Sequence, residues 1–165
     1  RGTAPNLTIE ENLALAYTRK ASPSFFALNK KDSAYFREVL STLGMGLEDR
    51  MKTKIGLLSG GQRQAASLLM ATIAEPELLL LDEHTAALDP GAAEKVMALT
   101  KKIVEENKIT TLMITHDMEY ALEYGSRTIM LDSGKIVMDL TGKEREEMTT
   151  WKLAELFYGK AHKRG

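Results

Sequence analysis

Two short stretches of this chain carry residues whose types and order suit phosphate chemistry. The first, Leu58 to Gln62, reads LSGGQ, a serine and two glycines ahead of a predicted helix. Backbone amides and the positive end of a helix can hold an anion at such a point. The second stretch is Leu78 to Leu81, an apolar run that leads into the adjacent carboxylates Asp82 and Glu83. A carboxylate pair there can hold a metal ion and polarise a water molecule, so the two stretches together indicate nucleotide hydrolysis.

Both stretches also have a plainer interpretation. Gly60 and Gly61 lack a Cβ, so the backbone can approach a phosphate closely, and Ser59 can add a hydrogen bond from its hydroxyl. The alternative is a glycine-rich start of a buried helix. Asp82 and Glu83 must point in different directions because side chains alternate along a strand. Their alternative is an acidic pair that only ends a strand, which four preceding leucines make less favoured.

The sequence up to about residue 74 indicates a largely helical segment. Thr8 and Glu11 predict a capping box at the start of its first helix, which should break at Ala21 to Ser24. The helices expected after that break are Lys31 to Leu43, a short one around Leu47 to Met51, and a long one from Ser59 to about Ala74. We therefore expect the first stretch of interest to open the longest of these helices.

From residue 75 onward, strands and helices alternate. The expected elements are a strand from Leu78 to Asp82, a helix from Asp89 to about Asn107, a strand from Thr110 to Thr115, a helix capped by Asp117 that ends at Tyr124, a hairpin of Arg127 to Leu131 with Ile136 to Leu140, and a final helix from Trp151 to Tyr158. The uninterrupted leucines predict a first strand buried on both faces. The alternation implies a mostly parallel sheet with crossover helices. We expect an α/β fold with a helical subdomain, 1–74, and part of an α/β core, 75–165.

Composition narrows the class of protein. The chain has 165 residues with 44% hydrophobic content, enough for one domain with a core. A formal net charge of -1 gives no basic surface for nucleic acid. The lack of cysteine excludes disulfides and thiolate metal sites within this sequence. Apolar runs stay below the roughly 20 residues that span a bilayer, so we expect any link to a membrane to run through a partner protein.

The LSGGQ and LLLLDE stretches resemble the signature and Walker B motifs of the ATP-binding cassette (ABC) ATPases. Ala86 to Pro90 (AALDP) resembles the D-loop of that family, and His116, which directly follows an apolar strand, resembles its switch histidine. The resemblance covers essentially the whole chain and implies a P-loop NTPase fold. One residue departs from the family pattern: His84 stands where the family often has proline, and we expect no catalytic role for it.

The resemblance implies a role for each matched residue, with ATP and Mg²⁺ as the ligands. Contacts to the nucleotide would come from Ser59, Gly60, Gly61, Gln62 and Asp89. Asp82 would hold Mg²⁺ directly or through water, and Glu83 would act as general base toward the attacking water. His116 would bridge the γ-phosphate and the catalytic glutamate.

The resemblance also implies partners. The signature motif of the family contacts the γ-phosphate held by the opposite subunit, so a second ATPase subunit in a head-to-tail dimer is expected. Transmembrane permease subunits would dock on the helical subdomain, within residues 1–50. The motif style is similar to bacterial import systems with a solute-binding lipoprotein. We expect a peripheral subunit on the cytoplasmic face of the cell membrane, with no nucleic acid partner.

One motif of the family is missing from the sequence. No G-x-x-x-x-G-K-[ST] loop occurs, and the chain opens at Arg1 without an initiator methionine. Because this loop precedes the signature in ABC ATPases, the sequence predicts the C-terminal two-thirds of a cassette, with no complete nucleotide site and no ATPase activity alone. The leading hypothesis is that the chain belongs to an ATPase subunit of a bacterial ABC transporter, and an importer is favoured over an exporter.

Two other functions stay open on sequence. A soluble ABC ATPase of DNA repair or translation would need a coiled-coil insertion, a tandem cassette or a basic surface, and none of these occurs within this sequence. A non-enzymatic interaction module is the second alternative, because the chain retains partner surfaces without a complete nucleotide pocket.

Overall fold

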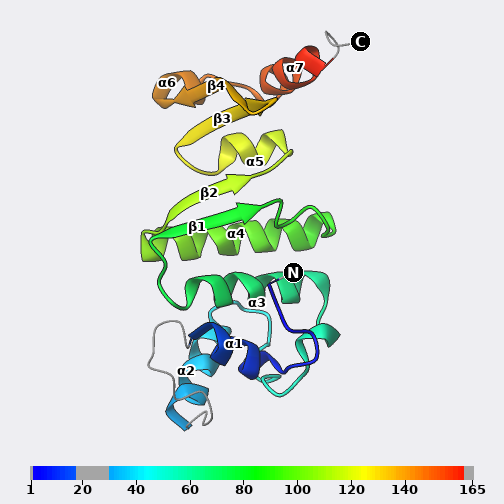
Figure 1. Ribbon diagram of the computed structural model, residues 1–165, viewed down its shortest axis with the longest axis vertical. Helices are drawn as coiled ribbons and strands as arrows, with labels where there is room; N and C mark the ends of the chain where they lie inside the picture. The colour runs from blue at the N-terminus through cyan, green and yellow to red at the C-terminus, as the bar shows by residue number, and fades with distance from the viewer. Residues whose placement is uncertain (1, 18–29, 162–165) are drawn as a thin grey trace. The chain divides into compact units, whose positions relative to one another are not determined.

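The computed structural model describes residues 2–17 and 30–161 (Figure 1). The backbone forms two compact units, Arg1–Met113 and Ile114–Gly165. The predicted helix break at Ala21 to Ser24 lies outside the described residues. The boundary expected after residue 74 separates a helical part from a mixed part, and it stays a prediction.

The first unit begins with helices. They are α1 (Ile9–Tyr17), α2 (Lys30–Ser41), the single 3₁₀ turn η1 (Ile55–Leu57) and α3 (Gly60–Thr72). The predicted capping box starts α1: the Thr8 amide donates to Glu11 Oε2 at 2.7 Å and the Glu11 amide donates to Thr8 Oγ1 at 3.2 Å. The two helices predicted after α1 on either side of the glycine turns, now α2 and α3, are confirmed to within a few residues at their ends.

The short helix predicted around Leu47 to Met51 is wrong. This segment forms turns, in which the Arg50 amide donates to the Leu47 carbonyl at 3.0 Å. The Met51 carbonyl accepts instead from the amide of Glu10 in α1, at 3.1 Å. Leu47 and Met51 are nevertheless buried. The apolar spacing therefore reflected burial of two side chains on α1, α2 and α3 and not a helical period.

The mixed part of the first unit places a helix between two paired strands. These are β1 (Leu78–Asp82), α4 (Pro90–Asn107) and β2 (Thr110–Ile114). Figure 1 shows the arrows of β1 and β2 pointing the same way, as the predicted crossover requires. Asp89 caps α4 by accepting from the Ala92 amide at 3.0 Å, and Pro90 occupies the first helical position. The α/β class predicted from the alternating pattern is confirmed.

The prediction that β1 is buried on both faces is wrong for the described residues. Leu79 and Leu81 are buried, whereas Leu78 and Leu80 are 54% and 65% exposed. Leu112 of β2 is exposed in the same way. The helices of this unit cover one face of the two-stranded sheet, so alternate leucines lie in the core and the others do not.

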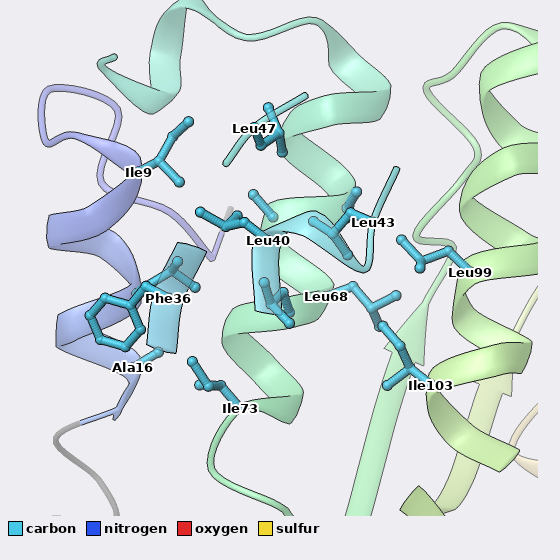
Figure 2. Packing of buried hydrophobic residues seen from close by; sticks show 14 of the residues in the cluster. Ile9, Ala16, Phe36, Leu40, Leu43, Leu47, Leu68, Ile73, Leu99 and Ile103 are labelled. Carbon is cyan, nitrogen blue, oxygen red and sulfur yellow. The ribbon is translucent and has the colours of Figure 1, made fainter. Parts of the chain in front are cut away.

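The core of the first unit joins the helices to the inner face of β1. Figure 2 shows Leu99 and Ile103 pointing from α4 toward α3, beside Leu68 of α3. Phe36 and Leu40 of α2 belong to the same cluster and are almost fully buried. Because apolar side chains of α3 and α4 share this cluster, burial fixes the start of α3 beside the start of α4.

The second unit contains a helix, a hairpin and two further helices. They are α5 (Met118–Glu123), β3 (Arg127–Asp132), β4 (Lys135–Thr141), α6 (Gly142–Glu146) and α7 (Thr150–Ala161). Strands β3 and β4 pair antiparallel, as predicted. The predicted cap of α5 is also confirmed, since Asp117 Oδ1 accepts from the amides of Glu119 and Tyr120 at 2.9 and 3.1 Å.

Helix α6 was not predicted, because its five residues, GKERE, carry no apolar period. Its structural role lies in Arg145, whose Nη2 donates to the carbonyls of Leu122 and Tyr124 at 2.6 and 2.9 Å. Arg145 Nε also donates to Thr128 Oγ1 at 3.0 Å. The side chain thus satisfies carbonyls at the end of α5, which have no partner inside that helix.

Within the described residues, no helix combines the length and apolarity needed to cross a bilayer.

Candidate functional site

The start of α3 is built by a reciprocal capping box between Ser59 and Gln62. Ser59 Oγ accepts from the Gln62 amide at 3.3 Å, and Gln62 Oε1 accepts from the Ser59 amide at 3.3 Å. Gln62 Nε2 also donates to the carbonyl of Met45 at 3.4 Å. Ser59 therefore has a structural role besides the predicted one. Its hydroxyl proton is not used in the capping bond, so the hydroxyl can still donate to an anion.

The two glycines of this turn lie against the segment that leads into α4. A Cβ added to Gly60 would stand 3.1 Å from Leu88 Cδ2, and one added to Gly61 would stand 3.2 Å from the Cβ of Ala92. Gly61 is buried, whereas Ser59 and Gly60 are exposed. Close helix packing therefore accounts for Gly61, while Gly60 combines packing with a backbone that a ligand can reach.

Gly61→Ala is expected to lower the free energy of unfolding of this chain by about 1–2 kcal/mol, because α3 and Ala92 must move apart by a few tenths of an ångström. Gly91→Ala is the matched control, since its new Cβ would meet only Asp89 Oδ1 at 3.7 Å. That control should be neutral or slightly stabilising. Urea unfolding followed by circular dichroism compares the two variants, and equal stabilities would contradict the close approach of α3 and α4.

A cavity of about 730 Å³ lies beside this turn. It brings together four of the residues predicted for the site: Ser59, Gly61, Gln62 and Asp89. The remaining wall comes from the turn after α2 and from α4, namely Thr42, Leu43, Gly44, Met45, Gly91, Ala92, Lys95, Ala98, Leu99 and Lys102. The exposed Lys95 and Lys102 add positive charge near the start of α3, where an anion would be held. Three other residues predicted for the site do not line this cavity: Gly60, Asp82 and Glu83.

Asp82 and Glu83 are exposed at the end of β1. Glu83 adopts a φ of +43°, in the left-handed region that a residue with a Cβ rarely occupies. The chain turns there: the Ala86 amide donates to the Glu83 carbonyl at 3.1 Å, and the loop continues to Asp89 at the start of α4. Glu75, Lys108 and Ser133 also have a positive φ, so this backbone marks a tight turn at Glu83 and does not by itself indicate function.

His84, for which no role was expected, makes a specific contact in the structure. Its side chain is half-buried, and Nε2 lies 3.2 Å from Oγ1 of Thr100 in the middle of α4. Burial lowers the pKa of His84 from its ordinary value because it disfavours the charged imidazolium. No sequence pattern could have indicated this contact, since it depends on α4 running back alongside β1.

His116 follows β2 and belongs to the second unit, where its side chain is exposed. The adjacent residues shape its backbone: the Asp117 amide donates to Thr115 Oγ1 at 3.0 Å, and Asp117 caps α5. The residue thus lies at the carboxyl end of a strand, where open α/β sheets carry ligand groups. Its predicted role as switch histidine stays a prediction.

The donor groups at the end of β1 are consistent with a magnesium ion held largely by its nucleotide. Among the described residues, no group of three or more histidine, aspartate or glutamate side chains could hold a metal by itself. Mg²⁺ is commonly bound through one or two carboxylates together with waters and substrate phosphates. The exposed carboxylate of Asp82 at a strand end fits that pattern.

Comparison with known proteins gives one family. The sequence model of the ABC transporter family matches residues 1–86, which contain the start of α3 and the end of β1. The chain is 43% identical over 156 residues to a tyrosine transport ATP-binding protein of Clostridioides difficile, covering 94% of this chain and 62% of that protein. It is 36% identical over 138 residues to the phosphonates import ATP-binding protein PhnC 2 of Oceanobacillus iheyensis, covering 82% of this chain and 54% of that protein.

Solved structures agree with the sequence relatives. The dimeric post-hydrolysis state of the ATP-binding cassette MJ0796 bound to ADP and Pi matches with a TM-score of 0.70 and 31% identity. The match covers 84% of this chain and 58% of that cassette. The predicted P-loop NTPase fold is thereby confirmed. In each of these matches the chain spans less than two thirds of the longer protein.

Proposed function

The chain belongs to the ABC transporter family, and from this premise we propose that it forms part of the ATP-hydrolysing subunit of a bacterial importer. The observation that carries the proposal is the cavity at the start of α3, which Ser59, Gly61 and Gln62 line together with Asp89, the N-cap of α4. These are residues of the signature and D-loop motifs, which the family uses at the nucleotide. The names of relatives that transport tyrosine and import phosphonates support transport, with import as the direction.

In this proposal the start of α3 binds the terminal phosphate of ATP. Ser59 donates its hydroxyl, and the amides of Gly60 and Gly61 donate their protons, because the first turn of a helix leaves its N–H groups without helical partners. Asp89 and Gln62 border the same cavity and orient the nucleotide. The phosphate would be held by a second subunit, so two subunits associate head to tail.

In the hydrolysis step, Glu83 lies next to the attacking water. The water oxygen bonds to the γ-phosphorus, the bond to the β-phosphate oxygen breaks, and Glu83 accepts the water proton, leaving ADP and phosphate. Asp82 would hold Mg²⁺, which when bound neutralises charge on the phosphates. His116 would contact the γ-phosphate and Glu83. The phosphate-binding loop G-x-x-x-x-G-K-[ST] does not occur in this sequence and would come from the part of the cassette that lies outside it.

The partners follow from the same proposal. Permease subunits would dock on the helical part of residues 1–50, and a solute-binding lipoprotein would deliver an amino-acid-like solute. The subunit would then lie at the cytoplasmic face of the membrane, held there by the permease. ATP binding would close two subunits on each other, and hydrolysis would reopen them.

Titration with MgATP tests the proposal. A complete cassette that carries this chain should bind MgATP and release phosphate at steady state, while the 165-residue chain alone should do neither. Isothermal calorimetry and a phosphate-release assay measure the two properties. Hydrolysis by the chain alone would show that the cassette needs no additional loop. A complete cassette that binds no MgATP would refute the assignment.

A further inference from the structure

The hydrogen bond between His84 and Thr100 joins the loop after β1 to the middle of α4. Thr100 is buried, and its hydroxyl donates to the carbonyl of Val96 one turn earlier in α4, at 2.8 Å. A hydroxyl has one proton, so Thr100 Oγ1 can only accept in its contact with His84 Nε2, at 3.2 Å. His84 therefore carries its proton on Nε2 and donates it to Thr100.

This bond acts one residue away from the strained position in the loop. Glu83 has a φ of +43°, which a residue with a Cβ adopts only when its surroundings hold it there. His84 is joined to Glu83 by a planar peptide, so fixing the imidazole of His84 on α4 restricts the rotation that would relax Glu83. Helix α4 itself is fixed through Val96 and Leu99 in the core. The bond thus transmits the rigidity of a packed helix to the backbone of Glu83.

We propose that His84 is a positioning residue, which holds the carboxylate of Glu83 in its working orientation through the hydrogen bond to Thr100. The inference rests on the proposed role of Glu83 as general base. It concerns a residue at which the sequence differs from the family pattern. Thr100 is the second partner, and neither residue lines the cavity at the start of α3.

Substitutions that remove one atom group at a time test the bond in the complete cassette. Thr100→Val keeps the volume of the side chain and removes the acceptor, whereas His84→Phe keeps an aromatic ring of somewhat larger size and removes the donor. Each should lower kcat for ATP hydrolysis about 5- to 10-fold, with KM for ATP unchanged within about 2-fold, because a misplaced base affects the chemical step and not nucleotide binding. Thr100→Ser and His84→Gln restore an acceptor and a donor, and each should recover most of the rate.

The double variant separates this mechanism from general loosening. Because both substitutions remove the same bond, His84→Phe combined with Thr100→Val should be no slower than the slower single variant. Thermal unfolding of each variant verifies folding, and if Thr100→Val does not fold, the His84→Phe and His84→Gln pair still decides. An unchanged kcat in His84→Phe, a rise in KM at constant kcat, or failure of His84→Gln to recover the rate would each overturn the proposal.

Glu83→Gln in the same assay distinguishes failure of this inference from failure of the proposed function. If Glu83→Gln abolishes turnover while His84→Phe leaves it unchanged, Glu83 is the base and only the positioning role of His84 is refuted. If Glu83→Gln turns over normally, the general-base role falls and the positioning role falls with it.

Discussion

A complete cassette that carries Glu83→Gln is expected to bind MgATP as the wild type does and to hydrolyse it at least about 100-fold more slowly. Glutamine has nearly the same size as glutamate but cannot accept the proton of the attacking water. The side chain of Glu83 is exposed, so the exchange places no new group in the core. Phosphate release at steady state measures turnover, and equilibrium binding of a fluorescent ATP analogue measures retention.

Glu77→Gln provides the matched control, since Glu77 is also exposed and precedes β1 as Glu83 follows it. This control should turn over ATP at the wild-type rate. Glu83→Asp should fall between the two, because it keeps the carboxylate but withdraws it by one methylene from the water. Normal turnover by Glu83→Gln would remove Glu83 from the role of general base.

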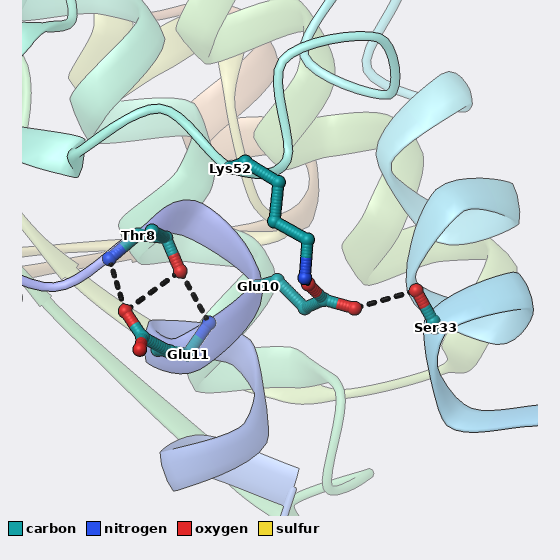
Figure 3. Close-up of polar contacts among 5 residues, drawn as sticks. All are labelled: Thr8, Glu10, Glu11, Ser33 and Lys52. Carbon is teal, nitrogen blue, oxygen red and sulfur yellow. Dashed lines mark hydrogen bonds and ion pairs between the residues drawn. The ribbon is translucent and has the colours of Figure 1, made fainter. Parts of the chain in front are cut away.

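Loss of the charge on Glu10 is expected to destabilise the first unit strongly. Glu10 of α1 is only 2% exposed, and its carboxylate accepts from Ser33 Oγ of α2 at 2.5 Å and from Lys52 Nζ (Figure 3). Burial by itself raises the pKa of Glu10. The hydrogen bonds from Lys52 and Ser33 and the charge of Lys52 together lower it by more, so the pKa lies below its ordinary value of 4.5. One carboxylate thereby joins α1, α2 and the turn before η1.

Glu10→Gln should therefore lower the free energy of unfolding at pH 7 by about 1–3 kcal/mol, because it removes two charge-assisted hydrogen bonds from a buried site. The folded-state pKa is depressed, so the contribution is complete above pH 4.5 and is lost as the pH falls through the lower folded-state value. The difference in stability between Glu10→Gln and the wild type should accordingly shrink at acid pH.

Urea unfolding of the 165-residue chain at several pH values measures both effects. Glu38→Gln removes the same charge from an exposed position of α2 and should change stability by less than about 0.5 kcal/mol. A constant difference between wild type and Glu10→Gln down to pH 3 would show that the charge of Glu10 contributes nothing. Lys52→Met would leave the buried carboxylate of Glu10 with Ser33 as its remaining partner, so it should destabilise the chain as well.

The features that could be predicted from the sequence are those decided by neighbouring residues. The capping residues Thr8 and Asp117 were identified correctly because a helix cap involves groups only two or three residues apart. The capping box of Ser59 and Gln62 belongs to the same class. It was not predicted, although the pattern S-x-x-Q is typical of a capping box.

The features that could not be predicted depend on residues far apart in the chain. Glu10 meets Lys52, and His84 meets Thr100, only after the helices have packed. The exposure of Leu80 has the same origin, since a run of leucines does not tell how many faces of a strand are covered. The residues of the candidate site could be predicted because they resemble the motifs of a known family. The cavity beside α3 could not be predicted, because it forms only when α3 packs on α4.

The left-handed backbone of Glu83 has a consequence for any attempt to engineer this chain toward heat resistance. Glycine adopts such a backbone without a steric penalty, so exchanging Glu83 for glycine relieves strain of about 1 kcal/mol. A library screened only for survival at high temperature would therefore enrich glycine at this position and discard the carboxylate. Selection for thermal stability favours glycine at this position, whereas selection for ATP hydrolysis favours glutamate. Only a screen that measures both properties will retain Glu83.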